Sequence, residues 1–109
     1  MTEMSIQEWV DRMPTYFIPE KADGVDATIQ LHLSGEQGGD WAVLIHNQNL
    51  DVITGEVSNP RLVLSGDAQD VLQVLSGKMD GMRAFMQGKI KMQGDMGLAM
   101  KLAGMFRQP

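Results

Sequence analysis

The sequence predicts an α+β fold in which helices cover one face of a five-stranded sheet. Three observations lead to this prediction. The middle of the chain contains segments in which apolar and polar residues alternate, as they do in half-buried strands. Segments with a helical spacing of apolar residues flank them, and glycine-aspartate pairs at 66–67 and 94–95 each separate a strand from a helix. Strands and helices of these lengths pack as two layers.

The composition is that of one globular domain spanning residues 1–109. Of the 109 residues, 43% are hydrophobic, which is enough for a core without further crosslinks. The chain contains no cysteine, which excludes disulfides, thiolate metal ligands and a cysteine nucleophile. The first residues have no signal-segment pattern, and no apolar run approaches the ~18 residues of a spanning helix. These features predict a soluble, cytoplasmic protein.

The charge is unevenly distributed along the chain. The net charge of −5 argues against nucleic acid as a partner. Residues 1–60 hold ten acidic and two basic side chains, whereas residues 61–109 hold four acidic and seven basic ones. The basic half also holds seven of the ten methionines, between residues 77 and 106. An apolar ligand with an anionic head group is therefore electrostatically acceptable there, and ordinary solvated lysines are the alternative.

The first element is a helix that begins at a capping box formed by Ser5 and Glu8. We expect Pro14 to end it, because proline lacks the N–H that a helix interior needs. The apolar face of this helix consists of Ile6, Trp9, Val10 and Met13. Residues 15–24 form a connector whose aromatic side chains we expect in the core.

Three strands then form an antiparallel meander with one apolar side. They span residues 25–33, 41–46 and 50–54, joined by a glycine-rich loop and a tight turn at 47–49. The expected register pairs residue 33 with 41, 31 with 43 and 29 with 45. His32 and His46 then lie on the outer face, roughly 13 Å apart, so they cannot share a metal ion.

Two helices and a short strand start the second half of the chain. The strand spans residues 61–65, and Asp67 caps the helix after it, which ends at Ser76-Gly77. The packing side of this helix carries Val71, Leu72, Val74 and Leu75. A second, shorter helix at 80–87 brings Met82, Phe85 and Met86 together.

The last strand, 89–93, leads into a helix that Asp95 caps and that runs from about Met96 to Phe106. Apolar residues cover roughly 220° of this final helix, whereas a helix on a sheet needs an apolar stripe only a little over 100° wide. Either the helix is packed on two sides or its surplus apolar surface faces a ligand. The flexible thioethers of methionine suit apolar ligands of varied shape, and methionines that only fill the core are the alternative.

The sequence shows no recognisable catalytic or metal-binding motif. The turn serines have no histidine neighbour in sequence, and the acidic residues lack the spacing of a calcium loop. The glycine spacings fit neither the dinucleotide fingerprint nor the phosphate loop. We therefore predict no enzyme activity, no catalytic residue, no metal ion and no cofactor.

The run from Arg83 to Leu102, RAFMQGKIKMQGDMGLAMKL, closely resembles the C-terminal signature of the sterol carrier protein type 2 domain. Segments 39–41, 55–60 and 71–79 are similar in order and spacing, so the resemblance covers roughly residues 5–106. It implies a five-stranded mixed, mainly antiparallel sheet with helices on one face that enclose an apolar tunnel for fatty acids, acyl thioesters or sterols.

The chain departs from this family pattern in two places. Many relatives carry a polar glutamine in the tunnel where this chain has Ala103, so polar anchoring at that depth is not expected here. Eukaryotic relatives often end in a peroxisomal signal, whereas this chain ends in Arg107-Gln-Pro109. Both departures are consistent with a free-standing cytoplasmic protein.

The predicted function is the binding of fatty acids, fatty acyl-CoA or sterol-like lipids without turnover, in a tunnel gated by the final helix. The predicted lipid-binding residues are Ile29, Leu31, Val43 and Ile45 in the floor, and Leu72, Leu75, Met82, Phe85, Met86, Met92, Met96, Met100 and Ala103 in the walls. The candidates for contact with an anionic head group are Lys78, Arg83, Lys89 and Lys101.

An alternative function is a protein-protein interaction or dimerisation domain that uses the same apolar helix and carries no lipid. Leu44 and Ile53 would belong to that surface. Under either function we expect a monomer or a weak homodimer. For the lipid carrier we also expect transient contact with a membrane surface or an enzyme.

Overall fold

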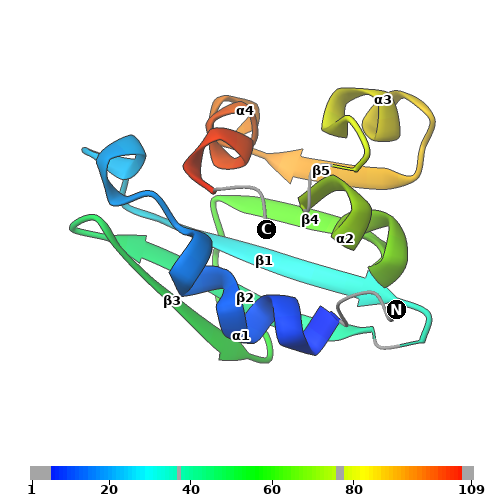
Figure 1. Cartoon of the computed structure of the whole chain (residues 1–109), viewed down its shortest axis with the longest axis horizontal. Helices are drawn as coiled ribbons and strands as arrows, with labels where there is room; N and C mark the ends of the chain where they lie inside the picture. The colour runs from blue at the N-terminus through cyan, green and yellow to red at the C-terminus, as the bar shows by residue number, and fades with distance from the viewer. Residues whose placement is uncertain (1–5, 37, 76–77, 107–109) are drawn as a thin grey trace.

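The structure, a computed structural model, describes residues 6–36, 38–75 and 78–106. Within them it shows the predicted α+β fold, a five-stranded mixed sheet with four α-helices packed against it (Figure 1). Strand boundaries differ from the predicted ones by one or two residues. The elements in chain order are α1 (Ile6–Tyr16), the 3-10 helix η1 (Pro19–Ala22), β1 (Ala27–Ser34), β2 (Gly39–His46), β3 (Asn49–Thr54), β4 (Leu62–Asp67), α2 (Ala68–Leu75), α3 (Gly81–Met86), β5 (Ile90–Gly94), α4 (Met96–Leu102) and the 3-10 helix η2 (Ala103–Met105). Among these described helices, none is long and apolar enough to cross a lipid bilayer.

The strands lie in the order β3-β2-β1-β4-β5, so β3 and β5 form the two edges. The meander β1-β2-β3 is antiparallel as predicted, β4 runs parallel to β1, and β5 runs antiparallel to β4. The turn between β2 and β3 contains Asn47 and Gln48 with φ of 51° and 62°, which is the two-residue hairpin geometry that matches strand twist.

The register between β1 and β2 differs from the predicted one by two residues. Leu31 pairs with Trp41 and Ile29 with Val43, instead of residue 31 with 43 and residue 29 with 45. The reason is a shorter loop, because β2 already begins at Gly39. A shift of two residues keeps every side chain on its predicted face, since side chains alternate with a period of two.

Helix α1 continues through Pro14 to Tyr16, so the prediction that Pro14 ends it is wrong. The missing proline N–H costs the helix one bond, but Trp9 and Met13 on the same helix are completely or almost completely buried. Packing of an apolar face outweighs local propensity in most protein helices. Beyond the proline, the Phe17 N–H still donates to the Met13 carbonyl at 3.1 Å. Ser5 of the predicted capping box lies outside the described residues, as do Ser76 and Gly77 of the predicted helix stop.

The final helix is shorter than predicted. It ends at Leu102, tightens into η2, and gives way to an extended backbone at Phe106, with φ −124° and ψ 140°. Phe106 forms an isolated antiparallel bridge with Phe17, and the Ile18 N–H donates to the Met105 carbonyl at 2.7 Å. These pairings with the segment after α1 require extended backbone where a continuing helix was expected.

Gln30 fixes the connection between β3 and β4 against the outer face of the sheet. This connection, residues 55–61, must cross β2 and β1 because β4 lies on the far side of β1. The Gln30 Nε2 donates to the carbonyls of Gly55 and Trp41 at 3.0 and 3.1 Å, and its Oε1 accepts from the Val57 N–H at 2.9 Å. The alternation pattern placed Gln30 on the outer face, yet it is only 2% exposed.

Replacing Gln30 with leucine should lower the free energy of unfolding by about 1–3 kcal/mol, because the partly buried Gly55 carbonyl and Val57 N–H would lose their partner. Urea denaturation measures this loss. Gln93→Leu, at an exposed position of β5, is the matched control and should change the free energy by less than about 0.5 kcal/mol. Equal losses in the two variants would contradict this role of Gln30.

Candidate functional site

A pocket of about 370 Å³ lies between the sheet and the helices. Side chains from the inner face of β1, β2, β4 and β5 line it, together with side chains from all four α-helices that the structure describes. The helices therefore cover the same sheet face, as predicted. Nearly all of these side chains are apolar, and the volume lies within the range of about 300–1,000 Å³ that is typical of small-molecule sites.

The structure brings most of the predicted lipid-binding residues together around this pocket. Those that line it are Ile29, Leu31, Val43, Met82, Phe85, Met92, Met96 and Met100. Their contact with a lipid stays a prediction.

Three predicted lipid-binding residues do not line the pocket. Ile45 pairs with Leu50 of the edge strand β3 and is buried there, and Leu72 is buried in the core under α2. Met86 is 78% exposed because it ends the short helix α3, which buries Ala84 instead. The side chains of two further residues, Leu75 and Ala103, lie outside the described part of the structure.

Helix α1 contributes pocket residues that the sequence did not assign to the site. Trp9 and Met13 line the pocket, and so does Phe106, whose ring centroid lies 5.8 Å from that of Trp9. Helical spacing identified the apolar face of α1 but not what that face would border. The helical spacing of α2 likewise identifies Val71 and Val74 only as packing residues, although both line the pocket.

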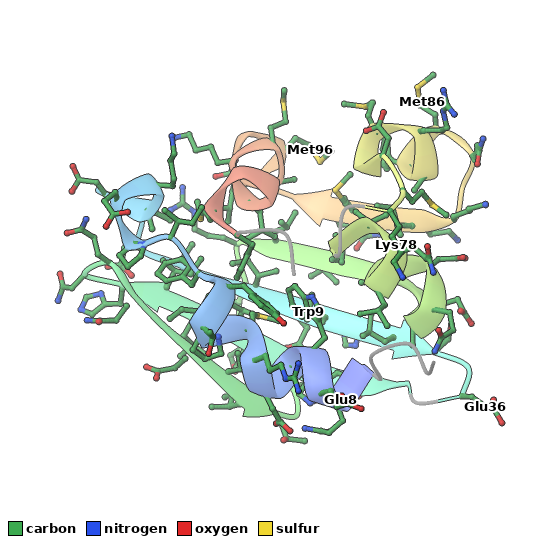
Figure 2. All side chains as sticks on the ribbon, viewed as in Figure 1. Glu8, Trp9, Glu36, Lys78, Met86 and Met96 are labelled. Carbon is green, nitrogen blue, oxygen red and sulfur yellow. The ribbon has the colours of Figure 1, made fainter. Side chains whose placement is uncertain are left out.

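The mouth of the pocket lies between α3 and α4. Met82, Phe85, Met96 and Met100 line the pocket, yet they are 53%, 37%, 41% and 73% exposed. Figure 2 shows Met86 and Met96 on the side of the molecule where these two helices lie. In α4, Leu98 and Leu102 are buried, so the surplus apolar surface predicted for this helix borders a pocket.

The charged residues near the mouth lie outside the pocket wall. Lys78, Arg83, Lys89 and Lys101 are exposed, and they are not among the residues that line the pocket. Asp80 does line it, but its Oδ1 accepts from the Met82 N–H at 3.1 Å and caps α3. Contact between these cations and a head group stays a prediction.

Helix α4 is held at both ends. At its start Asp95 is the predicted cap, because its Oδ1 accepts from the Leu98 N–H at 3.0 Å. The Arg61 guanidinium donates to the other carboxylate oxygen of Asp95 at 2.9 Å. The backbone carbonyl of Arg61 accepts from the Asp95 N–H at 2.8 Å. At the other end the bond from Ile18 to Met105 holds η2. The roof of the pocket is therefore tied to β4 and to the segment after α1.

The pKa of Asp95 is lowered below its ordinary value, chiefly because the carboxylate accepts from the Leu98 N–H, with a further contribution from the Arg61 guanidinium. A lowered folded-state pKa means that the stabilisation is complete above the ordinary aspartate pKa of about 3.9 and is lost as the pH falls through the folded value. The melting temperature of the wild type should therefore approach that of Asp95→Asn as the pH falls below about 4.

Thermal unfolding of both proteins across this pH range measures the effect. The exposed Asp51 on β3 offers a control, because Asp51→Asn removes a carboxylate that caps no helix. A difference in melting temperature between the wild type and Asp95→Asn that stays constant down to the lowest pH would contradict the role of the Asp95 charge.

The outer face of the sheet carries a separate polar cluster. The His32 Nδ1 lies 2.7 Å from the Asp40 carboxylate and 3.9 Å from that of Glu56, whereas His46 pairs with Asp26 at 3.2 Å. One ligand atom each from His32, Asp40 and Glu56 lie within 4.8 Å of one another, and these residue types bind zinc in many proteins. This group of three could hold a metal ion, and it is distinct from the pocket.

The chain is similar in sequence to parts of longer proteins. Hydroxysteroid dehydrogenase-like protein 2 of Xenopus tropicalis is 36% identical over 104 residues, which are 94% of this chain and 25% of that protein. The Homo sapiens protein of the same name is 38% identical over 90 residues, covering 79% and 22%. The chain thus spans about a quarter of the length of these relatives.

Solved structures share the fold. Sterol carrier protein 2 like 2 of Aedes aegypti superposes with a TM-score of 0.64 at 25% identity, over 93% of this chain and 95% of that one. The palmitated form of that protein gives 0.67 at 24% identity, over 93% of each chain. The sec-alkylsulfatase Pisa1 of Pseudomonas sp. gives 0.85 at 20% identity, over 97% of this chain but 17% of the enzyme, which shows the fold alone.

The match to a protein family extends over most of the chain. Residues 15–107 match the SCP-2 sterol transfer family, in agreement with the fold, the pocket and the resemblance of the C-terminal run. The chain therefore belongs to the SCP-2 sterol transfer family.

Proposed function

We propose that this chain is a lipid carrier domain that binds fatty acids, fatty acyl-CoA or sterol-like lipids in the pocket and releases them unchanged. The observation that carries the proposal is the apolar pocket of about 370 Å³ with its mouth between α3 and α4. Membership of a sterol transfer family supports a lipid ligand. The palmitated state of the Aedes aegypti relative supports a ligand with a long apolar chain.

Burial of an acyl chain provides the binding energy in this proposal. Each buried CH₂ contributes about 0.8 kcal/mol, and part of the total is lost in ordering the chain. A sixteen-carbon chain is then expected to bind with roughly micromolar affinity or better. Among the described residues that line the pocket, Asp80 caps α3 and the others carry no acidic or basic side chain, which is the reason for proposing binding without turnover.

Helix α4 is the proposed gate. Because Asp95 and Met105 tie both of its ends, we propose that the gate opens by a local shift of α4 and rotation of Met96 and Met100, without detachment of the helix. Methionine suits this role because its unbranched side chain has three rotatable bonds.

Native mass spectrometry of the purified protein, followed by solvent extraction of the bound material, tests the proposed function. A lipid bound in a 1:1 ratio, with a melting temperature that rises on adding lipid, would support it. A ligand-free mass, with no change of melting temperature across fatty acids, acyl thioesters and sterols, would contradict it.

A protein-protein interaction domain is the second candidate. The exposed methionines of α3 and α4, described above, favour it because they form an apolar surface next to the mouth. Leu44 and Ile53 do not extend this surface, since they lie on the outer face of β2 and β3, at the opposite edge from β5. Size-exclusion mass with and without fatty acid separates the candidates, because a dimer indifferent to lipid indicates the interaction domain.

A further inference from the structure

Three side chains of types that bind metal ions meet on the outer face of the sheet. They are His32 of β1, Asp40 of β2 and Glu56 of the connection between β3 and β4, and none of them lines the pocket. His32 and Asp40 lie directly opposite each other on the neighbouring strands. The sequence has no metal-binding spacing here, because the three residues come from separate segments that only the fold brings together.

Backbone hydrogen bonds hold Glu56 beside this pair. On one side of it, the Gly55 N–H donates to the Asp40 carbonyl at 2.8 Å. On the other side, the Val57 N–H donates to the Oε1 of the buried Gln30 at 2.9 Å. Both chain neighbours of Glu56 are therefore fixed to the sheet. Binding of a metal ion would need rotation of side chains but no rearrangement of the backbone.

The spacing of the three ligand groups fits a zinc ion. The His32 Nδ1 lies 2.7 Å from the Asp40 carboxylate and 3.9 Å from that of Glu56, and the three ligand atoms all lie within 4.8 Å of one another. Ligand atoms in tetrahedral zinc sites lie roughly 3.3–3.6 Å apart, since each is about 2.0–2.2 Å from the ion. The observed separations lie on both sides of this range. The side chains are 38%, 46% and 70% exposed, so they can rotate to meet it.

The charges around these side chains favour a divalent cation. Among the described residues, neither Asp40 nor Glu56 forms an ion pair with a lysine or an arginine. Two carboxylates so close together repel each other, and a cation between them removes this repulsion. Magnesium and calcium prefer sites made of oxygen ligands alone, whereas an imidazole nitrogen suits zinc.

We propose that His32, Asp40 and Glu56 bind a zinc ion through the His32 Nδ1 and one oxygen of each carboxylate, with water in the fourth tetrahedral position. The ion would join β1 and β2 to residues 55–61 and would stabilise the fold, because a ligand that binds the folded chain shifts the unfolding equilibrium. This inference is independent of the proposed lipid-binding function, since no zinc ligand lines the pocket.

Isothermal titration calorimetry of the tag-free chain with zinc chloride tests the proposal. We expect one zinc ion per chain and no binding of magnesium at the same concentration. His32→Gln and Glu56→Gln should each weaken zinc binding by about tenfold or more, because loss of a group that only orients a ligand already costs roughly 10- to 100-fold. His46→Gln is the matched control and should not change the affinity, since His46 pairs only with Asp26 among the described residues.

A second measurement locates the ion in the wild type. The ¹⁵N resonances of the His32 imidazole can be assigned from His46→Gln, because the chain has two histidines. They should move when zinc is added, whereas those of His46 should not. Glu56 is the most exposed of the three ligands, so Glu56→Gln tests the site even if His32→Gln folds poorly.

Three outcomes would overturn the proposal. They are the absence of saturable zinc binding to the wild type, equal losses of affinity in His32→Gln and His46→Gln, and a shift confined to the His46 resonances. Each of them leaves the lipid carrier function intact, because the native mass and melting experiments on lipid binding do not involve zinc.

Discussion

Replacing Ala99 with phenylalanine is expected to weaken lipid binding by about 100-fold and to leave the fold intact. Ala99 is half-buried on α4 and lines the pocket, so a phenyl ring at this position occupies space that the ligand would fill. Exclusion of three or four CH₂ groups corresponds to a loss of affinity of about 100-fold for a sixteen-carbon fatty acid. Displacement of a fluorescent fatty acid measures this loss.

Gly104→Phe is the control for the added ring. It places the same side chain on η2, where a Cβ would have no heavy atom within 4 Å, so the ring projects into open space and the affinity should not change. The ligand-free Ala99→Phe protein should melt at the same temperature as the wild type or higher, because filling a cavity adds contacts. Wild-type lipid affinity in a folded Ala99→Phe protein would show that the lipid does not bind in this pocket.

The second large effect is expected for Gly94→Ala, which should lower the free energy of unfolding by about 3–5 kcal/mol. Gly94 has a φ of +112°, and a Cβ on it would lie 2.3 Å from the Arg61 carbonyl oxygen. The backbones are close there because the Asp95 N–H donates to the same carbonyl. Alanine would push the start of α4 away from β4, so lipid affinity should fall together with the stability measured by urea denaturation.

Alanine substitutions at two other glycines distinguish the cost of backbone strain from the cost of a steric clash. Gly88 has a φ of +76° with nothing within 4 Å of its Cβ position, so Gly88→Ala should cost only about 1 kcal/mol. Gly104 has open space and no positive φ, and Gly104→Ala should change the free energy by less than about 0.5 kcal/mol. Similar losses for Gly94→Ala and Gly88→Ala would show that contact with Arg61 is unimportant.

Features of this fold that depend on local interactions could be predicted from the sequence. The Asp95 cap is one, because its carboxylate accepts from an N–H only three residues later. The turn at Asn47 and Gln48 and the alternation of β1 are others, since each follows from neighbouring residues. These features were sufficient to define five strands, their faces and the fold class.

Features that depend on distant partners were missed. Gln30 binds backbone groups 25 and 27 residues away, and the alternation of β1 does not show that residues 55–57 cross over it. The β1-β2 register depends on loop geometry, which the glycines of residues 35–39 leave free. Pro14 remains inside α1 because of packing against the core, which overrides the local preference of proline.

The candidate site likewise contains some residues that the sequence could identify and others that it could not. The C-terminal run contains Met92, Met96 and Met100, and its family resemblance pointed to residues that do line the pocket. Trp9 lies far from that run in sequence, and only the folded chain shows that its side chain lines the pocket. Met86 could not be separated from its neighbours, because the length of α3 determines which side chains turn inward.

The bridge between Phe17 and Phe106 also determines when the pocket can exist. The two residues are 89 positions apart (106 minus 17), so a ribosome that adds about 5–20 residues per second completes the meander seconds before Phe106 emerges. During that interval the inner face of β1 and β2 lacks the cover that α4 and Phe106 provide in the folded chain, so part of its apolar surface is accessible to chaperones and to other nascent chains. The complete pocket can form only after translation has delivered the C-terminal segment, because Phe106 and residues of α4 line it.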